Sequence, residues 1–186
     1  MTKSQKIKLN PFDLESNIDL GFLECIRDLL ENPEVRRLNA YIQHSTSTRL
    51  QHCLNVSYYG YKLARQLDYD FRSCARGGLL HDLYLYNTGQ GISRRFVARH
   101  LRTHPQTALE NAERLFELNE IEKDIILKHM WPVTPDLPKF PEAFLIANVD
   151  KYCASLEAFG RGLKREPSRP CRASFKLAAK AFDWVG

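Results

Sequence analysis

Apolar residues recur at every third or fourth position along most of the chain, which is the spacing of one buried helix face. Glycine and proline fall between these periodic segments, and the alternation typical of strands is absent. The pattern therefore predicts an all-α fold. The expected helices cover residues 19–31, 34–41, 48–66, 71–83, 105–118, 120–130, 141–159 and 170–185.

Polar residues with helix-capping chemistry mark several of these starts. Thr48 with Gln51, and Asn119 with Glu122, have the spacing of a capping box, in which two side chains satisfy free amides of the first turn. Pro105 fits the first turn of a helix, because proline has no N–H to leave unpaired there. We therefore expect a new helix to begin at Pro105, separate from the basic segment before it.

The 186 residues are enough for a single domain with a sizeable core. We expect this core at about residues 45–160, with the N-terminal helices at 18–41 and a basic C-terminal helix at 170–185 packed on it. No apolar run approaches the roughly 18–20 residues of a membrane span, and the N-terminus lacks the apolar part of a secretory signal. The five scattered cysteines indicate free thiols, so a cytoplasmic protein that does not bind membranes is predicted.

Positive charge is concentrated in two places, and the net charge is +5. One group of arginines follows the pair His81-Asp82, and the other basic group begins at Arg161. Such groups suit anionic partners, including small phosphorylated molecules, although a solvated face is the plainer reading of the C-terminal group. Because aromatic residues do not alternate with these charges, nucleic-acid binding is not expected.

Four histidines and two aspartates recur in order along the predicted helices. They are His52, His81, Asp82, His104, His129 and Asp150. The pair His81-Asp82 lies in a segment rich in glycine and leucine, and Asp150 lies in a helix that is apolar almost all round. A buried carboxylate is costly unless it is paired or binds a metal. These aspartates are therefore the strongest candidates for a functional site.

Imidazole and carboxylate groups together are the ligands of hydrolytic divalent-metal sites, and six of them are enough for two metals. Helix bundles build such sites from side chains that project inward from facing helices. Several unrelated buried ion pairs would be a purely structural alternative. His104 and His129 decide between one metal and two. A purely structural role is the alternative for both, because each lies near a predicted helix end, where a structural histidine is common.

The order His52, His81-Asp82, Asp150 resembles the H…HD…D signature of the HD superfamily of metal-dependent phosphohydrolases. The resemblance covers about residues 45–160, and it implies an all-α HD-domain bundle with a central metal site. Arg49 also matches a common R-x-x-H start.

The two remaining histidines, His104 and His129, are similar to those of the dinuclear branch of this superfamily. That branch includes diadenosine-tetraphosphate hydrolases and cyclic-dinucleotide phosphodiesterases. The resemblance implies that Asp82 bridges two metals, the second held by His104 and His129. The ligands of the first metal would be His52, His81, Asp82 and Asp150. The chain departs from the family pattern after the HD pair, where no lysine follows, and the GYP motif of the cyclic-dinucleotide enzymes is missing.

Such a site would activate a hydroxide between two metals, with Asp82 as the bridging and orienting carboxylate. Arg49, one turn from His52, is the first candidate for binding substrate phosphate, followed by Lys151 and Lys128; ordinary surface charge is the alternative for each. The ligands suit two divalent metal ions, with Fe or Mn favoured and Zn, Co, Ni or Mg as alternatives. The predicted reaction is cleavage of a phosphomonoester, or a phosphodiester or phosphoanhydride, in a small nucleotide-like substrate.

Two other functions use the same residues. A diiron oxygenase also places histidines and carboxylates around two irons in a helical bundle. A non-catalytic, metal-stabilised sensor or interaction module would use the metals for folding and the basic C-terminal helix for binding. The sequence does not select the substrate or the oligomeric state.

Overall fold

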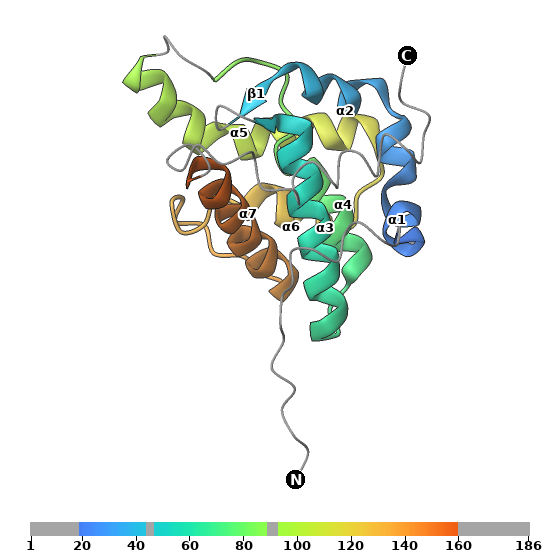
Figure 1. Cartoon of the computed structure of the whole chain (residues 1–186). Coiled ribbons are helices and arrows are strands. Elements are labelled where there is room, and N and C mark those ends of the chain that lie inside the picture. The colour runs from blue at the N-terminus through green and yellow to red at the C-terminus, as the bar shows by residue number, and fades with distance from the viewer. Residues whose placement is uncertain (1–18, 44–46, 89–92, 160–186) are drawn as a thin grey trace.

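The computed structural model describes residues 19–43, 47–88 and 93–159. Within these ranges the chain forms seven α-helices and two short strands, and Figure 1 shows them gathered into one bundle. The predicted all-α fold is confirmed. The predicted helix at residues 170–185 lies outside the described residues. None of the described helices is both long and apolar enough to span a membrane.

The N-terminal helices form one side of the bundle. Helix α1 (Leu20–Glu31) begins where the carboxylate of Asp19 caps its free amides, and it ends at Asn32. Asn32 in turn caps α2 (Pro33–Arg37), which continues into the 3₁₀ helix η2 (Leu38–Ala40). The helix predicted for this second segment is therefore divided into two shorter turns of different helical type.

A short hairpin leads into the central helix. Strand β1 (Ile42–Gln43) pairs antiparallel with β2 (Ser47–Thr48), and each strand is too short to produce a visible alternation in the sequence. The hydroxyl of Thr48 then caps α3 (Arg49–Leu67) by accepting from the amide of Gln51. The predicted start of this helix is thus confirmed.

Helix α3 packs against α4 (Phe71–Leu80) at the centre of the bundle (Figure 1). The two backbones approach closely at Gly78, where an added Cβ would lie 2.9 Å from the Cα of Ser57. Only glycine permits this spacing without a shift of the helices. Helix α4 ends earlier than predicted, so that His81 and Asp82 lie in the turn that follows it.

Helix α5 (Arg94–Leu115) corrects one prediction. Pro105 lies inside this single helix, so the prediction that a new helix begins there is wrong. Ser93 already caps the helix by accepting from the amide of Phe96, and proline within a formed helix removes one hydrogen bond without ending it. His104 is therefore held within a helix and not at its start. The first turns of α5 project from the bundle in Figure 1.

The last two helices complete the bundle. Helix α6 (Glu120–Lys128) begins at the predicted capping box, in which Asn119 and Glu122 exchange side-chain to main-chain hydrogen bonds. Helix α7 (Pro141–Phe159) has the predicted bounds and packs against α3 and α6. The capping box and the extent of α7 are both confirmed.

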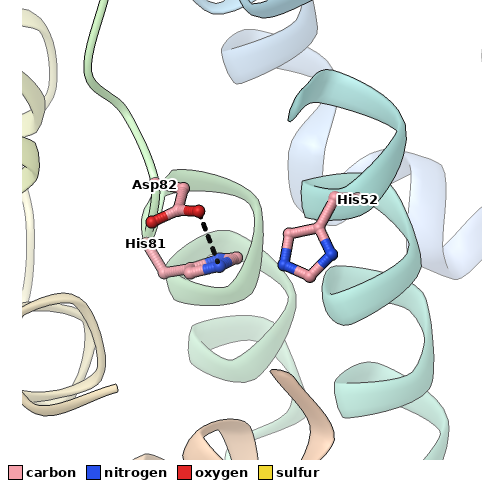
Figure 2. Close-up of side chains that lie close together, drawn as sticks. All are labelled: His52, His81 and Asp82. Carbon is pink, nitrogen blue, oxygen red and sulfur yellow. Dashed lines mark ion pairs between the residues drawn. The ribbon is translucent and has the colours of Figure 1, made fainter. Parts of the chain in front are cut away.

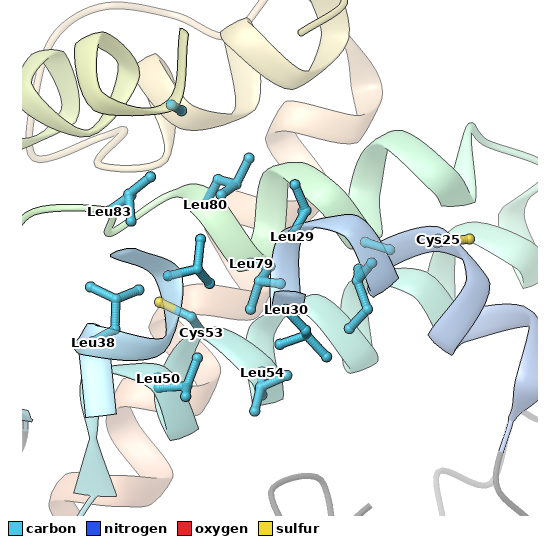
Figure 3. Close-up of a cluster of buried hydrophobic side chains, with 14 of the residues drawn as sticks. Cys25, Leu29, Leu30, Leu38, Leu50, Cys53, Leu54, Leu79, Leu80 and Leu83 are labelled. Carbon is cyan, nitrogen blue, oxygen red and sulfur yellow. The ribbon is translucent and has the colours of Figure 1, made fainter. Parts of the chain in front are cut away.

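Two clusters of buried apolar side chains hold these helices together. The larger joins helices α1 to α6 together with η2, and Figure 3 shows Leu29, Leu54 and Leu79 among its members. The smaller joins α3, α4, α6 and α7 through side chains such as Val56 and Ile146. Helices α3 and α4 belong to both clusters, so the polar residues that they carry are held firmly from two sides.

Candidate metal centre

The turn after α4 places the HD pair in the interior. His81 is fully buried, and Asp82 is only 5% exposed. His81 directs Nδ1 at the carbonyl oxygen of Gly78, 2.8 Å away, and Oδ2 of Asp82 accepts from the side-chain amide of Gln43 at 2.7 Å. Both side chains are therefore oriented by hydrogen bonds to other parts of the protein.

Residues far apart in the sequence meet around Asp82. His52 on α3, His81 and Asp82 each offer one ligand atom, all within 4.8 Å of one another, and so do Asp82, His104 and His129. Figure 2 shows His52 on its helix facing His81, with Asp82 beside His81. Asp82 belongs to both groups, so the geometry resembles two adjoining cation sites that share one carboxylate.

Asp150 on α7 lies with the first of these groups. Its Oδ1 atom is 3.0 Å from Nε2 of His52 and 3.7 Å from Nε2 of His81. The six residues singled out from the sequence thus lie together. They come from α3, the turn after α4, α5, the end of α6 and α7. We refer to these six side chains as the ligand cluster.

The four imidazoles of the ligand cluster are each held at Nδ1. His81, His104 and His129 direct this atom at a main-chain carbonyl of the preceding turn, at 2.8, 2.9 and 2.8 Å. A carbonyl oxygen only accepts, so Nδ1 carries the proton in each of these hydrogen bonds, and a neutral ring would present the lone pair of Nε2 to a cation. Nδ1 of His52 instead lies 3.1 Å from a carboxylate oxygen of Glu157. Metal-binding histidines are commonly oriented by partners of both kinds.

The ligand cluster has fewer hydrogen-bond donors than acceptors. A cation fits such a site, because it would satisfy acceptor atoms that lack a donor. Within the described parts of the chain, Nε2 of His81 and Oδ1 of Asp82 are buried without a hydrogen-bond partner. The Nε2 atoms of His104 and His129 face each other at 2.8 Å, a contact that needs either a proton on one ring or a cation nearby. Because nitrogen and carboxylate oxygen atoms converge, these residues fit divalent metals that accept mixed ligands.

Electrostatics keep the two carboxylates ionised. Burial opposes ionisation of Asp82, yet neighbouring imidazoles, His81 foremost, hold the pKa of this carboxyl well below its usual range. Burial is likewise outweighed at Asp150, whose pKa is lowered by its hydrogen bond with His52. Burial would lower the pKa of His52, but the hydrogen bonds to carboxylates, Asp150 foremost, raise it to about 10. Asp82 and Asp150 therefore stay ionised because cationic imidazoles face them, and a divalent cation would offset the same two negative charges.

The family model of the HD domain matches residues 49–155, which is more than half of the chain. The chain belongs to the HD-domain family. This family is the superfamily of metal-dependent phosphohydrolases that the order of His52, His81-Asp82 and Asp150 indicated. No curated protein and no solved structure matches the chain significantly.

Arg49 has a structural position in this HD domain. The side chain is fully buried, and its guanidinium donates to the carbonyl oxygens of Tyr84 and Tyr86 at 2.6 and 3.2 Å. It also donates to Oε1 of Gln43 at 3.0 Å and stacks on the ring of Tyr84, 3.7 Å from the centroid. These contacts hold the segment that follows the HD pair. They favour a supporting role for Arg49 over the predicted contact with substrate phosphate.

The two lysines expected near phosphate also make contacts within the HD domain. Nζ of Lys151 donates to the main-chain oxygens of His129 and Ala147, at 2.9 Å each. Lys128 pairs with Asp136 at 3.8 Å. Lys151 therefore links α7 to the end of α6 beside the ligand cluster. A role in substrate binding stays a prediction for both lysines.

Aromatic side chains support the second group of ligands, and His100, which the sequence indicated only as a structural or surface histidine, is one of them. Its ring stacks on His104 with centroids 4.5 Å apart, and its Nδ1 accepts from the hydroxyl of Tyr86 at 3.0 Å. Burial and the nearby His104 lower the pKa of His100 to about 4, so that this ring is neutral and able to accept. Its position one turn before His104 was the available signal.

Two further orienting residues, Gln43 and Glu157, were missed by sequence reasoning, and both lie outside the match to the HD family model. Gln43 donates to Asp82, and Glu157 is bonded to His52. Glu157 follows Asp150 by two helical turns on the same face of α7, which was a usable signal. Gln43 gave none, because its partner is determined by how the hairpin packs on the turn after α4.

Proposed function

We propose that this HD domain is a phosphohydrolase that uses two divalent metal ions. Its substrate would be a small, nucleotide-like molecule, cleaved at a phosphomonoester, phosphodiester or phosphoanhydride bond. The observation that carries the proposal is the pair of three-residue groups that share Asp82. A carboxylate common to two adjoining sites suits a reaction in which two metals act on one phosphoryl group.

The ligand cluster divides between the two ions. His52, His81 and Asp82, with Asp150 beside them, would hold the first, and Asp82, His104 and His129 the second. When bound, such ions lower the pKa of water and offset charge on phosphoryl oxygens. Fe or Mn is the favoured metal, and Zn, Co, Ni and Mg are the alternatives to test.

The residues of the chain contribute by orientation and by burial. Gln43 holds Oδ2 of Asp82, while Oδ1 lies 3.4 Å from Nε2 of His104 and 3.6 Å from Nε2 of His129. This arrangement keeps one oxygen of the shared carboxylate turned toward the second group. The buried surroundings strengthen electrostatic interactions with a phosphate, because little water screens them.

The proposal is tested by metal analysis combined with a substrate panel. The purified protein, loaded separately with Mn, Fe, Zn, Co, Ni or Mg, is assayed on phosphomonoesters, dinucleotide polyphosphates and cyclic dinucleotides. We expect turnover in at least one class, and its loss together with the metal in Asp82→Ala. Asp124→Asn is the matched control, because Asp124 is a buried carboxylate that accepts from the amides of Lys139 and Phe140. Turnover by Asp82→Ala equal to that of the parent would contradict the proposal.

The same preparations separate the two rival functions. Consumption of dioxygen with iron and a reductant, in the presence of a polyol or phosphonate, would identify a diiron oxygenase. Tight metal binding with thermal stabilisation, but without turnover on any phosphate ester of the panel, would identify a non-catalytic module.

A further inference from the structure

Glu157 is a buried carboxylate near the C-terminal end of α7, and the mechanism proposed above does not use it. It is 6% exposed, although glutamate is seldom buried without partners. It also lies beyond residues 49–155, the part of the chain that the family model matches.

Three described residues bring donors to this carboxylate. Nδ1 of His52 lies 3.1 and 3.3 Å from its two oxygens. The side-chain amide of Asn55, one turn after His52 on α3, donates to Oε1 at 3.2 Å, and the hydroxyl of Ser47 on β2 donates to Oε2 at 3.0 Å. Glu157 thus connects α7 with α3 and with the hairpin that precedes it.

His52 differs from the other three histidines of the ligand cluster in how it is held. The others are oriented by main-chain carbonyls of their own chain segment, whereas His52 is oriented by a side chain from another helix. Asp150 on the same helix contacts Nε2 of His52, so α7 reaches both nitrogens of this ring. The placement of His52 consequently depends on the docking of α7 against α3.

We infer that Glu157 is a positioning residue for the metal centre, which keeps the Nδ1 proton of His52 in place and directs Nε2 at the first metal position. The inference rests on the proposed function in one respect, namely that His52 binds a metal. A carboxylate on the far nitrogen fixes the tautomer and strengthens the imidazole as a ligand. Ser47 and Asn55 keep the carboxylate itself in place.

Glu157→Gln is the sharpest test, because it changes the chemistry and barely changes the volume. A carboxylate accepts at both oxygens, whereas an amide presents one acceptor and one donor. In the variant at least one of the donors from His52, Asn55 and Ser47 would face an NH₂ group. Glu142→Gln is the matched control, because Glu142 is buried on the same helix and accepts from the amide of Asp70 at 3.0 Å.

The measurement is the affinity for Mn²⁺ and Co²⁺, by competition with a chromophoric chelator, together with the thermal unfolding of the metal-free proteins. We expect Glu157→Gln to weaken binding of one ion by about 10–100-fold, the range for residues that orient a metal ligand. The Co²⁺ absorption spectrum should change in this variant. Glu142→Gln should lower the unfolding temperature at most, with parental affinity and spectrum.

A cycle with His52→Ala tests whether Glu157 acts through His52. Adding Glu157→Gln to His52→Ala should cause little further loss of affinity, because the residue through which it acts is already gone. If Glu157→Gln does not fold, Ser47→Ala removes one donor to the carboxylate, and a smaller loss of affinity is expected. Parental affinity and spectrum in Glu157→Gln, or parental affinity in Ser47→Ala where that variant is needed, would overturn the inference.

These outcomes are distinct from failure of the proposed function. A parent protein that binds two metals but hydrolyses no phosphate ester contradicts the proposed function. Weakened metal binding by Glu157→Gln would still support the positioning role in that case. Turnover by the parent, together with unchanged metal affinity in Glu157→Gln, contradicts the positioning role alone. A parent protein that binds no divalent metal overturns both.

Discussion

Two groups of charged side chains in this bundle differ in how their charge is balanced, and all of their members but the exposed Asp28 are buried or nearly so. In the ion-pair cluster, Arg76 on α4 donates to Glu122 on α6 at 2.8 Å and to both oxygens of Asp28 on α1, at 2.7 and 2.8 Å. In the ligand cluster, acceptor atoms face one another, and two of them find no donor among the described residues. The ion-pair cluster is complete as a structural link, whereas the ligand cluster has the ligand atoms of a cation site.

The largest expected effect comes from removing the carboxylate that both ligand groups share. Asp82→Ala should reduce turnover by about 10⁴-fold or more, because two-metal chemistry supplies several kcal/mol of transition-state stabilisation. The purified variant should also lose its metal, as measured by elemental analysis beside steady-state kinetics. Retention of both ions by Asp82→Ala would show that this carboxylate is not shared between them.

The ion-pair cluster should respond in the opposite way. Arg76→Ala leaves Glu122 buried without its charged partner, and a change of this kind costs about 3–5 kcal/mol of unfolding free energy. Urea denaturation of the metal-free protein measures this loss, while the metal affinity of the folded variant should stay parental. A variant with normal stability and weakened metal binding would break the comparison between the two clusters.

Removal of metal should destabilise the folded protein through the ligand cluster and not through the ion-pair cluster. A metal at a free concentration 100-fold above its dissociation constant stabilises the folded state by about 2.7 kcal/mol per site, provided that it does not bind the unfolded chain. Thermal unfolding with and without a chelator should reveal this gain in the parent and in Arg76→Ala alike. An equal gain in Asp82→Ala would indicate that the metal binds elsewhere.

The smallest effect concerns the residue that orients Asp82 from outside the ligand cluster. Gln43→Ala removes the hydrogen bond to Oδ2 of Asp82 and should weaken metal binding by about tenfold, at the lower end for such residues. Chelator competition measures the change. Gln106→Ala, on the exposed face of α5, is the control and should bind metal as the parent does.

The parts of the fold that local chemistry controls were predictable from the sequence. The caps at Thr48 and Asn119 act on amides only three residues away, so the start of a helix follows from its neighbours. Pro105 shows the limit of this reasoning, because a residue that favours a first turn is also tolerated inside a helix that Ser93 has already started. Local signals therefore predicted helices better than they predicted where one helix divides from the next.

The six residues of the ligand cluster were predictable from the sequence, whereas the residues that orient them were not. Asp82 and Asp150 stood out because charged residues in apolar segments need a compensating partner. The partners of Arg49, Gln43 and Glu157 come from other elements. Tertiary packing determines these partners, and the sequence of one segment does not indicate which element will pack against it. Arg49 illustrates the consequence: its place one turn before His52 suggested phosphate binding, yet its side chain turns to main-chain carbonyls.

The most direct test of the two-metal account is a crystal structure of the Mn²⁺-loaded protein, with metal positions located by anomalous scattering. We predict two peaks on either side of Asp82, one beside His52 and His81 and the other beside His104 and His129. A single peak, or peaks that do not contact Asp82, would contradict the account.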